Sequence, residues 1–242
     1  DYADERLLER LVRILEADER VGFAYCRSWS VAEDDRLLNL TEPVVDAADL
    51  PRWTADYCAE GKEECRRYFA RNNVVANASA VVFRKAVYDA VGGADESLKL
   101  CGDWKVWAGM ALRGKVAYVS EPLNYYRYHG ASVRAKSVRS GLTLCETLMV
   151  RRWLVEQLPE ARATVEGLRP YMARVGVPAL MSSHVPRETK RMLYRELRAM
   201  GALSLGQVIG PVFEAIGLKI RRHRREWMAH AGATRQAGGA SK

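Results

Sequence analysis

Three features that mark common protein classes are missing from this 242-residue sequence. No stretch reaches the roughly 18 consecutive apolar residues that a membrane-spanning helix requires. The five cysteines are odd in number and include no Cys-x-x-Cys pair, which argues against a disulfide framework or a zinc site and favours a reducing compartment. No charged-then-apolar leader follows Asp1, so a cytoplasmic location is expected.

A net charge is also missing from most of the chain. Residues 1–186 hold 26 Lys and Arg against 26 Asp and Glu, whereas residues 187–242 hold 12 against 4. A basic segment of this kind favours anionic partners, either a nucleic acid or a membrane surface. No helix-turn-helix or base-stacking motif accompanies it, so nucleic-acid binding is the weakest of the hypotheses.

Hydrophobic periodicity predicts an α/β chain with a helical C-terminal part. Asp4–Ala17 has the pattern of an amphipathic helix, with Leu8 among the residues of its apolar face. Gly92 and Gly93 are expected to end a short helix, because glycine tolerates the left-handed conformation at that position. The other expected elements are strands at Val21–Trp29, Val81–Phe83 and Val116–Val119, and helices at Arg84–Val91, from Asp103 to Gly114, at Ser140–Leu158 and at Glu188–Met200.

The segment Ala32–Asn73 is harder to interpret, although it contains a predicted helical stretch near Ala55–Ala70. It is rich in aromatic residues, which admit two interpretations. They could form a sugar-binding face, since aromatic rings stack on the C–H faces of sugars, or they could close a small satellite core. The residues concerned are Trp53, Tyr57, Tyr68 and Phe69.

Five short motifs follow one another between Arg84 and Val133. They are Arg84-Lys85, Gly92-Gly93-Ala94-Asp95-Glu96, Gly102-Asp103-Trp104, Glu121-Pro122-Leu123 and Tyr126-Arg127-Tyr128-His129-Gly130-Ala131-Ser132-Val133. In this order and at this spacing they resemble the C-terminal half of the catalytic domain of family-two glycosyltransferases, which have the GT-A fold. The sequence departs from that family at Gly102, where the family usually has glutamate.

The resemblance implies an inverting glycosyltransferase that moves a sugar from a nucleotide-diphosphate sugar donor to an acceptor hydroxyl. The acceptor would be a sugar or a lipid-linked molecule in cell-surface polysaccharide or glycolipid synthesis. The residues alone favour a plain helix cap for Asp103. The resemblance instead places the family's catalytic base at this aspartate, and the two roles are compatible.

Substrate and metal contacts are implied at further positions. Asn77, Ser79, Gly102, Trp104 and Arg127 are the expected substrate-binding residues. A divalent metal, Mn or Mg, would be held by Asp1 and His129, although His129 could instead be bonded at a strand end and Asp1 could be an ordinary surface carboxylate.

The resemblance also implies a division of the chain. Residues 1–135 would form the C-terminal part of a GT-A domain, residues 136–231 a helical region and residues 232–242 a disordered tail. The family's nucleotide-binding half is expected before Asp1, so this chain by itself is predicted to be inactive. A catalytically silent binding module with the same fold is the alternative function.

The tail suggests a membrane partner. Leu203–Ile220 is apolar but broken by glycine and proline, and Arg221, Arg222, Arg224 and Arg225 follow it beside Trp227. An apolar segment joined to a basic cluster and an interfacial aromatic residue suits peripheral binding to an anionic membrane. The other interpretation is a helix packed on the catalytic domain with a solvated basic end.

Overall fold

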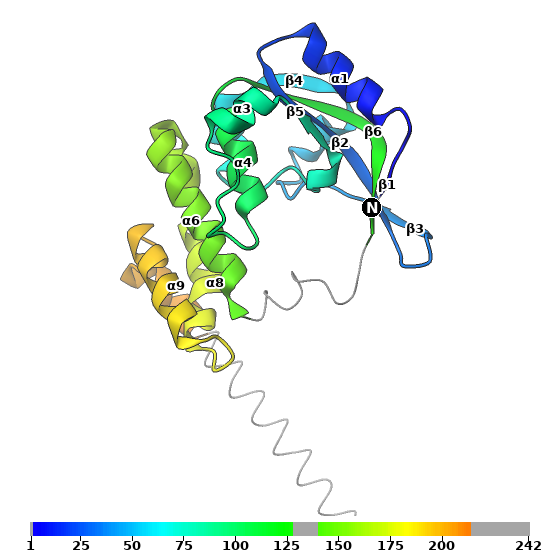
Figure 1. The fold of residues 1–242 in the computed structure, drawn as a ribbon. Helices are drawn as coiled ribbons and strands as arrows, with labels where there is room; N and C mark the ends of the chain where they lie inside the picture. The colour runs from blue at the N-terminus through cyan, green and yellow to red at the C-terminus, as the bar shows by residue number, and fades with distance from the viewer. Residues whose placement is uncertain (1, 128–139, 214–242) are drawn as a thin grey trace, which may run out of the picture. The chain divides into compact units, whose positions relative to one another are not determined.

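A computed structural model describes residues 2–127 and 140–213 of the chain (Figure 1). Contacts within the chain divide it into two units, Asp1–Leu168 and Arg169–Lys242, and each unit is described by itself below. The first unit contains a curled mixed sheet with flanking helices, so the α/β class expected from the sequence is confirmed. The division at Leu168 places the first helices of the predicted C-terminal region in the same unit as the sheet.

The sheet is built on one long parallel pair of strands, β2 (Val21–Val31) and β6 (Lys115–Arg127). Each long strand carries two short antiparallel strands on its other edge. The short partners of β2 are β5 (Val81–Phe83) and β3 (Leu37–Leu40), and those of β6 are β4 (Tyr57–Glu60) and β1 (Tyr2–Ala3). Parallel strands cannot be joined by a tight turn, so a long segment connects β2 to β6. This segment contains other strands and helices of the fold.

Strand β6 is longer than the strand predicted at Val116–Val119, because it continues through Glu121-Pro122-Leu123. The strand continues through Pro122 as a bulge, since Val119 pairs with Cys26 while the next partner of β2 is Pro122, opposite Arg27. Proline cannot donate to a sheet ladder, and it is tolerated at such bulges. Two residues of β6, Ser120 and Glu121, have no partner on β2 in this register, and Ser120 donates its backbone N–H to Asp56 at 2.8 Å.

One face of the sheet is covered by helix α1 (Leu7–Ala17). Its buried positions Leu7, Leu11 and Leu15 recur at the spacing of one helical face. They join a core whose sheet residues are Ala24, Cys26, Ala117, Val119 and Leu123. Leu8 was expected on the same apolar face, but it is 63% exposed.

Successive residues of a strand point to opposite sides of the sheet. The residues that point to the other side of this sheet pack against aromatic side chains. Helix α4 (Gly102–Ala111) places the ring of Trp107 at 5.6 Å from that of Phe23. Beside it lies the aromatic cluster, which we define as Tyr25, Trp53, Tyr57, Tyr68 and Tyr118. Trp53 and Tyr68 are 3% and 2% exposed, so the satellite-core interpretation of these residues describes them better than a sugar-binding face.

The helix predicted near Ala55–Ala70 begins too early. Its first part is strand β4, and helical structure starts only with α2 (Gly61–Glu64) and continues as a π-helical turn, η2 (Cys65–Phe69). Gly61 marks the change. A Cβ atom there would lie 1.9 Å from the carbonyl oxygen of Ala111, at the end of α4. Only glycine allows the two backbones to come this close, which fixes α2 beneath α4.

Short elements lead from the sheet to α4. The 3₁₀ turns η1 (Leu50–Thr54) and η3 (Ala78–Ala80) precede β4 and β5, and helix α3 (Lys85–Ala90) follows β5. Gly92 and Gly93 end α3 with φ values of 84° and 70°, which confirms the predicted glycine stop. The chain then runs through residues 94–101 into α4.

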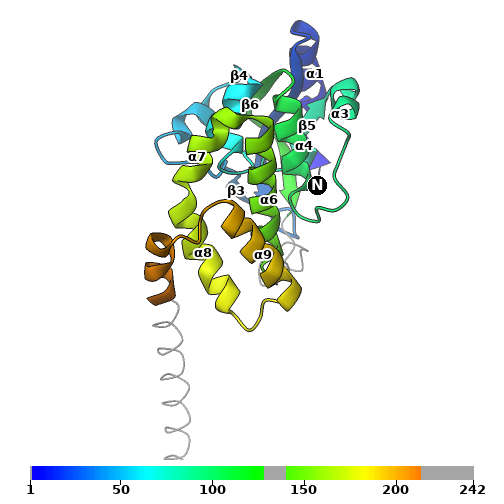
Figure 2. The ribbon, with the colours of Figure 1, turned by 90° about the vertical axis from the view of Figure 1, so that its left-hand side faces the viewer.

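Helix α6 (Leu142–Gln157) lies beside α4, and the two helices are adjacent in both ribbon views (Figure 2). It confirms the helix predicted over Ser140–Leu158. A 3₁₀ turn, η4 (Pro159–Ala161), and helix α7 (Arg162–Gly167) complete the first unit. The sequence had assigned these helices to a separate region.

The described part of the second unit is a helical hairpin followed by a short helical segment. Helices α8 (Arg169–Met181) and α9 (Arg187–Ala199) pack closely, because Gly176 of α8 faces Leu197 of α9. Helix α9 confirms the helix predicted over Glu188–Met200. Residues 205–213 are helical, and no helix in the described residues is long and apolar enough to cross a membrane.

Candidate functional site

Asp103 is the second residue of α4, in the first turn of the helix. The sequence suggested that it caps this helix, but the N-cap position belongs to Cys101, whose side chain makes no capping bond. Asp103 nevertheless satisfies one free donor of the first turn, since its Oδ1 accepts the backbone N–H of Trp104 at 2.7 Å. The side chain is partly exposed, so a carboxylate reaches solvent at the positive end of a helix.

The second oxygen of Asp103 is held by Asn73. The Nδ2 of Asn73 donates to Oδ2 of Asp103 at 3.4 Å, a long bond. Asn73 is itself fixed, because its Oδ1 accepts the backbone N–H of Val75 at 3.1 Å in a local turn. The Asp103 corner, which we define as Asp103 together with residues 72–77, therefore joins two segments thirty residues apart in the sequence.

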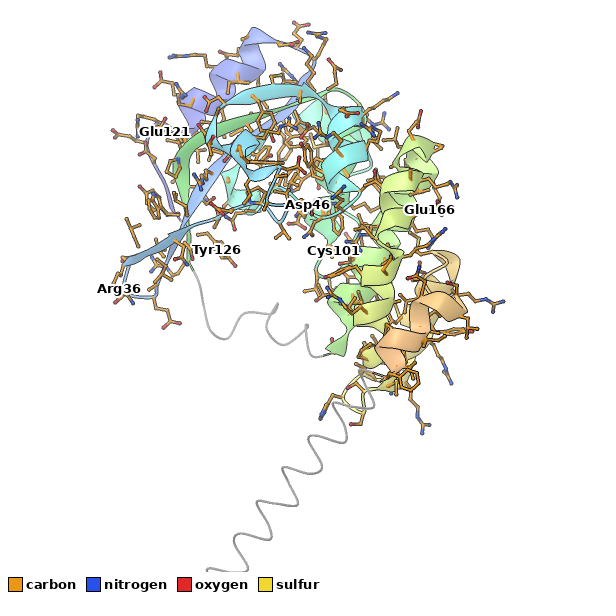
Figure 3. All side chains as sticks on the ribbon, turned by 180° about the vertical axis from the view of Figure 1, so that it is seen from behind. Arg36, Asp46, Cys101, Glu121, Tyr126 and Glu166 are labelled. Carbon is orange, nitrogen blue, oxygen red and sulfur yellow. The ribbon has the colours of Figure 1, made fainter. Side chains whose placement is uncertain are left out.

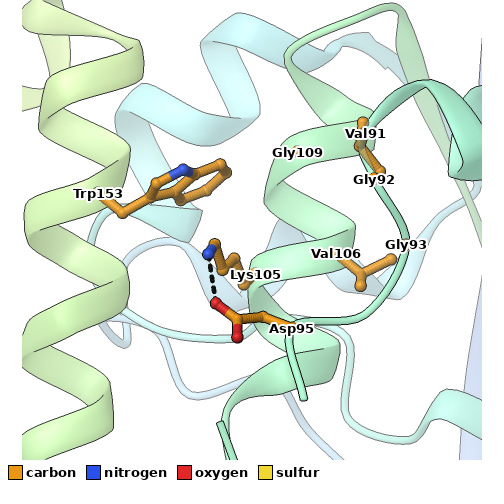
Figure 4. A pocket seen from close by; sticks show the side chains of 8 residues that line it. All are labelled: Val91, Gly92, Gly93, Asp95, Lys105, Val106, Gly109 and Trp153. Atoms are coloured by element: carbon orange, nitrogen blue, oxygen red, sulfur yellow. Dashed lines mark hydrogen bonds and ion pairs between the residues drawn. The ribbon is translucent and has the colours of Figure 1, made fainter. Parts of the chain in front are cut away.

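An ion pair ties the segment before α4 to the helix itself (Figure 4). The Nζ of Lys105 lies 2.6 Å from Oδ2 of Asp95, and 5.5 Å from the centre of the Trp153 ring. Asp95 also accepts the backbone N–H and hydroxyl of Ser97 at 3.0 and 2.6 Å. The bonds from Lys105 and Ser97 lower the pKa of Asp95 to about 2. A cavity of about 290 Å³ adjoins this pair, and the two charges that line it satisfy each other.

Asn77 lies in the Asp103 corner, at the N-terminus of η3. It is 8% exposed, and its Nδ2 has no hydrogen-bond partner among the described residues. Buried polar atoms are nearly always paired in native structures. This amide is therefore a candidate donor to a ligand, and the substrate-binding role expected of Asn77 stays a prediction.

Ser79 belongs to a different polar group. It accepts a bond from Nδ2 of Asn124 at 3.2 Å, and the same nitrogen donates to Ser28 at 3.0 Å. Asn124 and Ser28 are both 1% exposed, whereas Ser79 is exposed. These three side chains link η3 to the two long strands, so Ser79 has a structural partner as well as a free surface.

Gly102 and Trp104 flank Asp103 in different ways. Trp104 is 2% exposed, and its Nε1 donates to the carbonyl of Phe69 at 3.1 Å, so it anchors α4 in the core. Gly102 has space for a side chain, because a Cβ there would lie 3.7 Å from the nearest atom, the carbonyl oxygen of Asp95. The absence of the family's glutamate at Gly102 is thus not imposed by the fold.

Arg127 is not brought to Asp103. It lies at the end of β6 and donates to the carbonyl oxygens of Ala32 and Glu33 at 2.9 and 3.0 Å, and it pairs with Asp35. These partners belong to the hairpin between β2 and β3, whose tip carries Arg36 (Figure 3). Arg127 therefore fastens this hairpin to the last residues of the sheet.

The two expected metal ligands, Asp1 and His129, lie outside the described residues. Within residues 2–127 and 140–213, no group of three or more His, Cys, Asp or Glu side chains is arranged to hold a metal ion. The predicted metal therefore remains a prediction.

Two residues that support the site were missed in the sequence. Asn73 stands in a segment without a clear pattern. Glu146 is buried on α6 and binds the loop that precedes Asp103. A signal for Glu146 did exist, because it is a carboxylate in a helix whose neighbouring positions, such as Leu142 and Val150, are apolar.

Comparison with known proteins adds no family assignment. No model of a protein family matches the chain, and no curated protein sequence matches it either.

Proposed function

We propose that this chain is the acceptor-side part of an inverting glycosyltransferase of the GT-A fold, with Asp103 as its general base. The observation that carries the proposal is the placement of Asp103, a partly exposed carboxylate in the first turn of α4 that accepts a bond from Asn73. Four residues after Asn73 comes Asn77, whose amide nitrogen has no partner among the described residues. The sequence motifs from Arg84 to Val133 supply the reaction class by resemblance.

The proposed reaction is a single displacement at the anomeric carbon of a nucleotide-diphosphate sugar. The acceptor hydroxyl oxygen forms the new bond to that carbon while the bond to the diphosphate oxygen breaks. Asp103 takes the hydroxyl proton, and the electron pair of the broken bond leaves with the nucleotide diphosphate. Asp103 is a partly exposed carboxylate in the first turn of α4, and a carboxylate in such a place can take this proton from a bound hydroxyl.

The fold is consistent with this proposal without establishing it, because one fold can host many functions. A parallel pair of long strands with antiparallel edges suits the second half of a GT-A sheet, and so does a helix between them in the chain whose first turn carries the acidic residue. A divalent metal held by Asp1 and His129 would stabilise the departing diphosphate. Asp1 and His129 lie outside the described residues, and the proposed displacement uses Asp103 alone among the protein's side chains.

The test is the variant Asp103→Asn in the natural protein that contains this chain. The amide cannot accept the proton, so turnover should fall by roughly 10²–10⁴-fold while donor binding is retained. Asp95→Asn is the matched control, because Asp95 is a neighbouring carboxylate already paired with Lys105. Turnover of Asp103→Asn equal to that of the natural protein would refute the assignment.

A catalytically silent module is the second candidate, favoured by Gly102, which lacks a carboxylate although the fold has space for a Cβ atom there. The two candidates differ in a simple measurement. The enzyme should transfer sugar from, or slowly hydrolyse, at least one of a panel of UDP- and GDP-sugars in the presence of manganese. The silent module should bind an acceptor glycan and release no nucleotide.

We also propose that the second unit contacts an anionic membrane. In the helical residues 205–213, Leu205, Ile209 and Phe213 recur at intervals of four and are 76%, 48% and 71% exposed. This spacing places them on one helix face. The arginine cluster from Arg221 to Arg225 follows in the sequence, and it is complementary in charge to anionic lipid headgroups.

Liposome co-sedimentation at low and high salt tests the membrane proposal. Binding to vesicles of phosphatidylserine and phosphatidylcholine should exceed binding to pure phosphatidylcholine, and should weaken with salt. Replacing Leu205, Ile209 and Phe213 with serine should abolish it, and Leu8→Ser on the exposed side of α1 is the control. Equal binding to neutral vesicles, or no binding at all, would contradict the proposal.

A further inference from the structure

Glu146 is a buried carboxylate whose oxygens accept bonds from the backbone next to the proposed site. It lies in α6 and is 2% exposed. Its Oε1 accepts the N–H of Lys99 at 2.9 Å, and its Oε2 accepts those of Leu100 and Cys101 at 2.8 and 2.9 Å. Bonds from neutral donors to a charged acceptor are among the strongest in proteins, and three of them fix the conformation of three successive peptide groups.

These three peptide groups lead directly into the first turn of α4. Cys101 occupies the N-cap position of the helix, and Gly102 and Asp103 follow. The N-cap side chain makes no capping bond, so the carboxylate of Glu146 supplies a negative group at this helix end, where the helix dipole favours one. The direction in which Asp103 leaves the backbone therefore depends on a residue of α6.

A second residue of α6 acts on the other segment of the Asp103 corner. Arg151 is 4% exposed, and its Nη2 donates to the carbonyl oxygen of Arg71. Its guanidinium also lies 6.0 Å from the centre of the Trp104 ring. Arg71 stands two residues before Asn73, the side chain that donates to Asp103. Helix α6 thus holds both segments that meet at the proposed base.

We infer that α6 is the positioning element of the site: Glu146 sets the direction of Asp103, and Arg151 sets the segment that carries Asn73. The inference rests on the proposed function, because it takes Asp103 to be the base. Its physical basis is that a general base works only when held close to the productive geometry, and a misplacement of about 1 Å costs up to 10²-fold in rate. It also extends the catalytic part of the chain beyond residue 135, to include α6.

The decisive variant is Glu146→Gln. The amide keeps the shape of the side chain but presents an NH₂ group to backbone donors, so at least one of the three bonds is lost. We expect kcat to fall about 10–100-fold, with the donor KM within about twofold of the natural value. The acid limb of the kcat–pH profile should also move, since Asp103 would sit in a changed environment. A merely structural role would leave that limb in place.

Two further variants complete the design. Glu146→Asp retains the carboxylate and should recover part of the lost rate. Glu156→Gln is the matched control on the same helix. Glu156 is exposed, and the partner that it has among the described residues is Arg152 of α6, at 2.9 Å. The kcat of this variant should be unchanged. If Glu146→Gln does not fold, the same measurements on Glu146→Asp decide, with a smaller loss of kcat expected.

Amide hydrogen exchange gives a readout that does not depend on catalysis. The amides of Leu100 and Cys101 should exchange at least about tenfold faster in Glu146→Gln than in the natural protein. Unchanged exchange would overturn the inference. A normal kcat in Glu146→Gln, together with an inactive Asp103→Asn, would also overturn the inference. This result would leave the proposed function standing. Full turnover in Asp103→Asn would instead remove the proposed function, and the positioning role with it.

Discussion

The aromatic cluster and the Asp103 corner are both rich in polar side chains, but they satisfy these groups in opposite ways. In the cluster the polar tips bond to each other: Trp53 Nε1 donates to the Tyr25 hydroxyl at 3.2 Å, and the hydroxyls of Tyr25 and Tyr57 lie 2.8 Å apart. In the corner, Asp103 is partly exposed and the amide of Asn77 is unpaired. The first arrangement favours stability, whereas the second retains binding capacity at a cost in stability.

The largest effect should come from Trp53→Ala in the aromatic cluster. This change removes a ring that is 3% exposed and packs edge-on against Tyr68 at 4.9 Å. We expect the free energy of unfolding to fall by about 3–5 kcal/mol. Asp103→Asn, measured beside it by chemical denaturation, should change that free energy by less than about 1 kcal/mol. Similar losses in the two variants would erase the contrast.

Alkaline pH should weaken the cluster next. Burial raises the pKa of Tyr25 and also that of Tyr118. Because the folded state favours the neutral phenol, its contribution is complete below the ordinary pKa of about 10 and is lost as pH rises above it. At about pH 11 the two phenols together should lower the free energy of unfolding by about 2–3 kcal/mol. Denaturation curves across this range, with Tyr25→Phe showing a smaller loss, test the expectation.

Asn77→Ala should have a smaller effect, in keeping with an unpaired amide. Little hydrogen bonding is lost, so the free energy of unfolding should stay within about 1 kcal/mol of the natural value, while the acceptor KM rises. Asn124→Ala is the comparison, because Asn124 is also buried but donates two bonds. It should be less stable by about 1–3 kcal/mol. An equal loss in both variants would show that Asn77 has a structural partner.

The smallest effect is expected from Asp95→Asn, beside the Asp103 corner. The pKa of Asp95 is lowered to about 2 by its bonds to Lys105 and Ser97. A lowered pKa gives stability that is present above the ordinary value near 4 and disappears as pH falls through 2. The pair is partly exposed, at 29% and 31%, so about 0.5 kcal/mol is expected near neutral pH. The difference from the natural protein should vanish toward pH 2.

Much of the fold could be predicted because its signals are local. The periodicity of Leu7, Leu11 and Leu15 predicted α1, and Gly92-Gly93 predicted the end of α3, since each depends on residues a few positions apart. Leu8 shows the limit of this method. Its apolar character is visible in the sequence, but whether a partner covers it depends on what packs against the helix, and nothing among the described residues buries it.

The errors share a physical cause. The predicted strand ended at Val119, yet a bulge opposite Arg27 carries β6 past Pro122, and Asp56 accepts the N–H of Ser120 at this bulge. Residues 57–60 pair with β6 as a strand although they were predicted to be helical. In both places a distant partner outweighed the local preference, as is common for strands.

The amino-acid sequence alone determined the α/β class, the order of most elements and the position of Asp103 at the start of a helix. Tertiary structure alone decided what surrounds that carboxylate. Asn73 and Glu146 stand 30 and 43 positions away from it along the chain, and only folding places one on its oxygen and the other on the loop that carries it. Local patterns record which residues share a face, whereas the partner of a buried polar group is set by packing between elements distant in sequence.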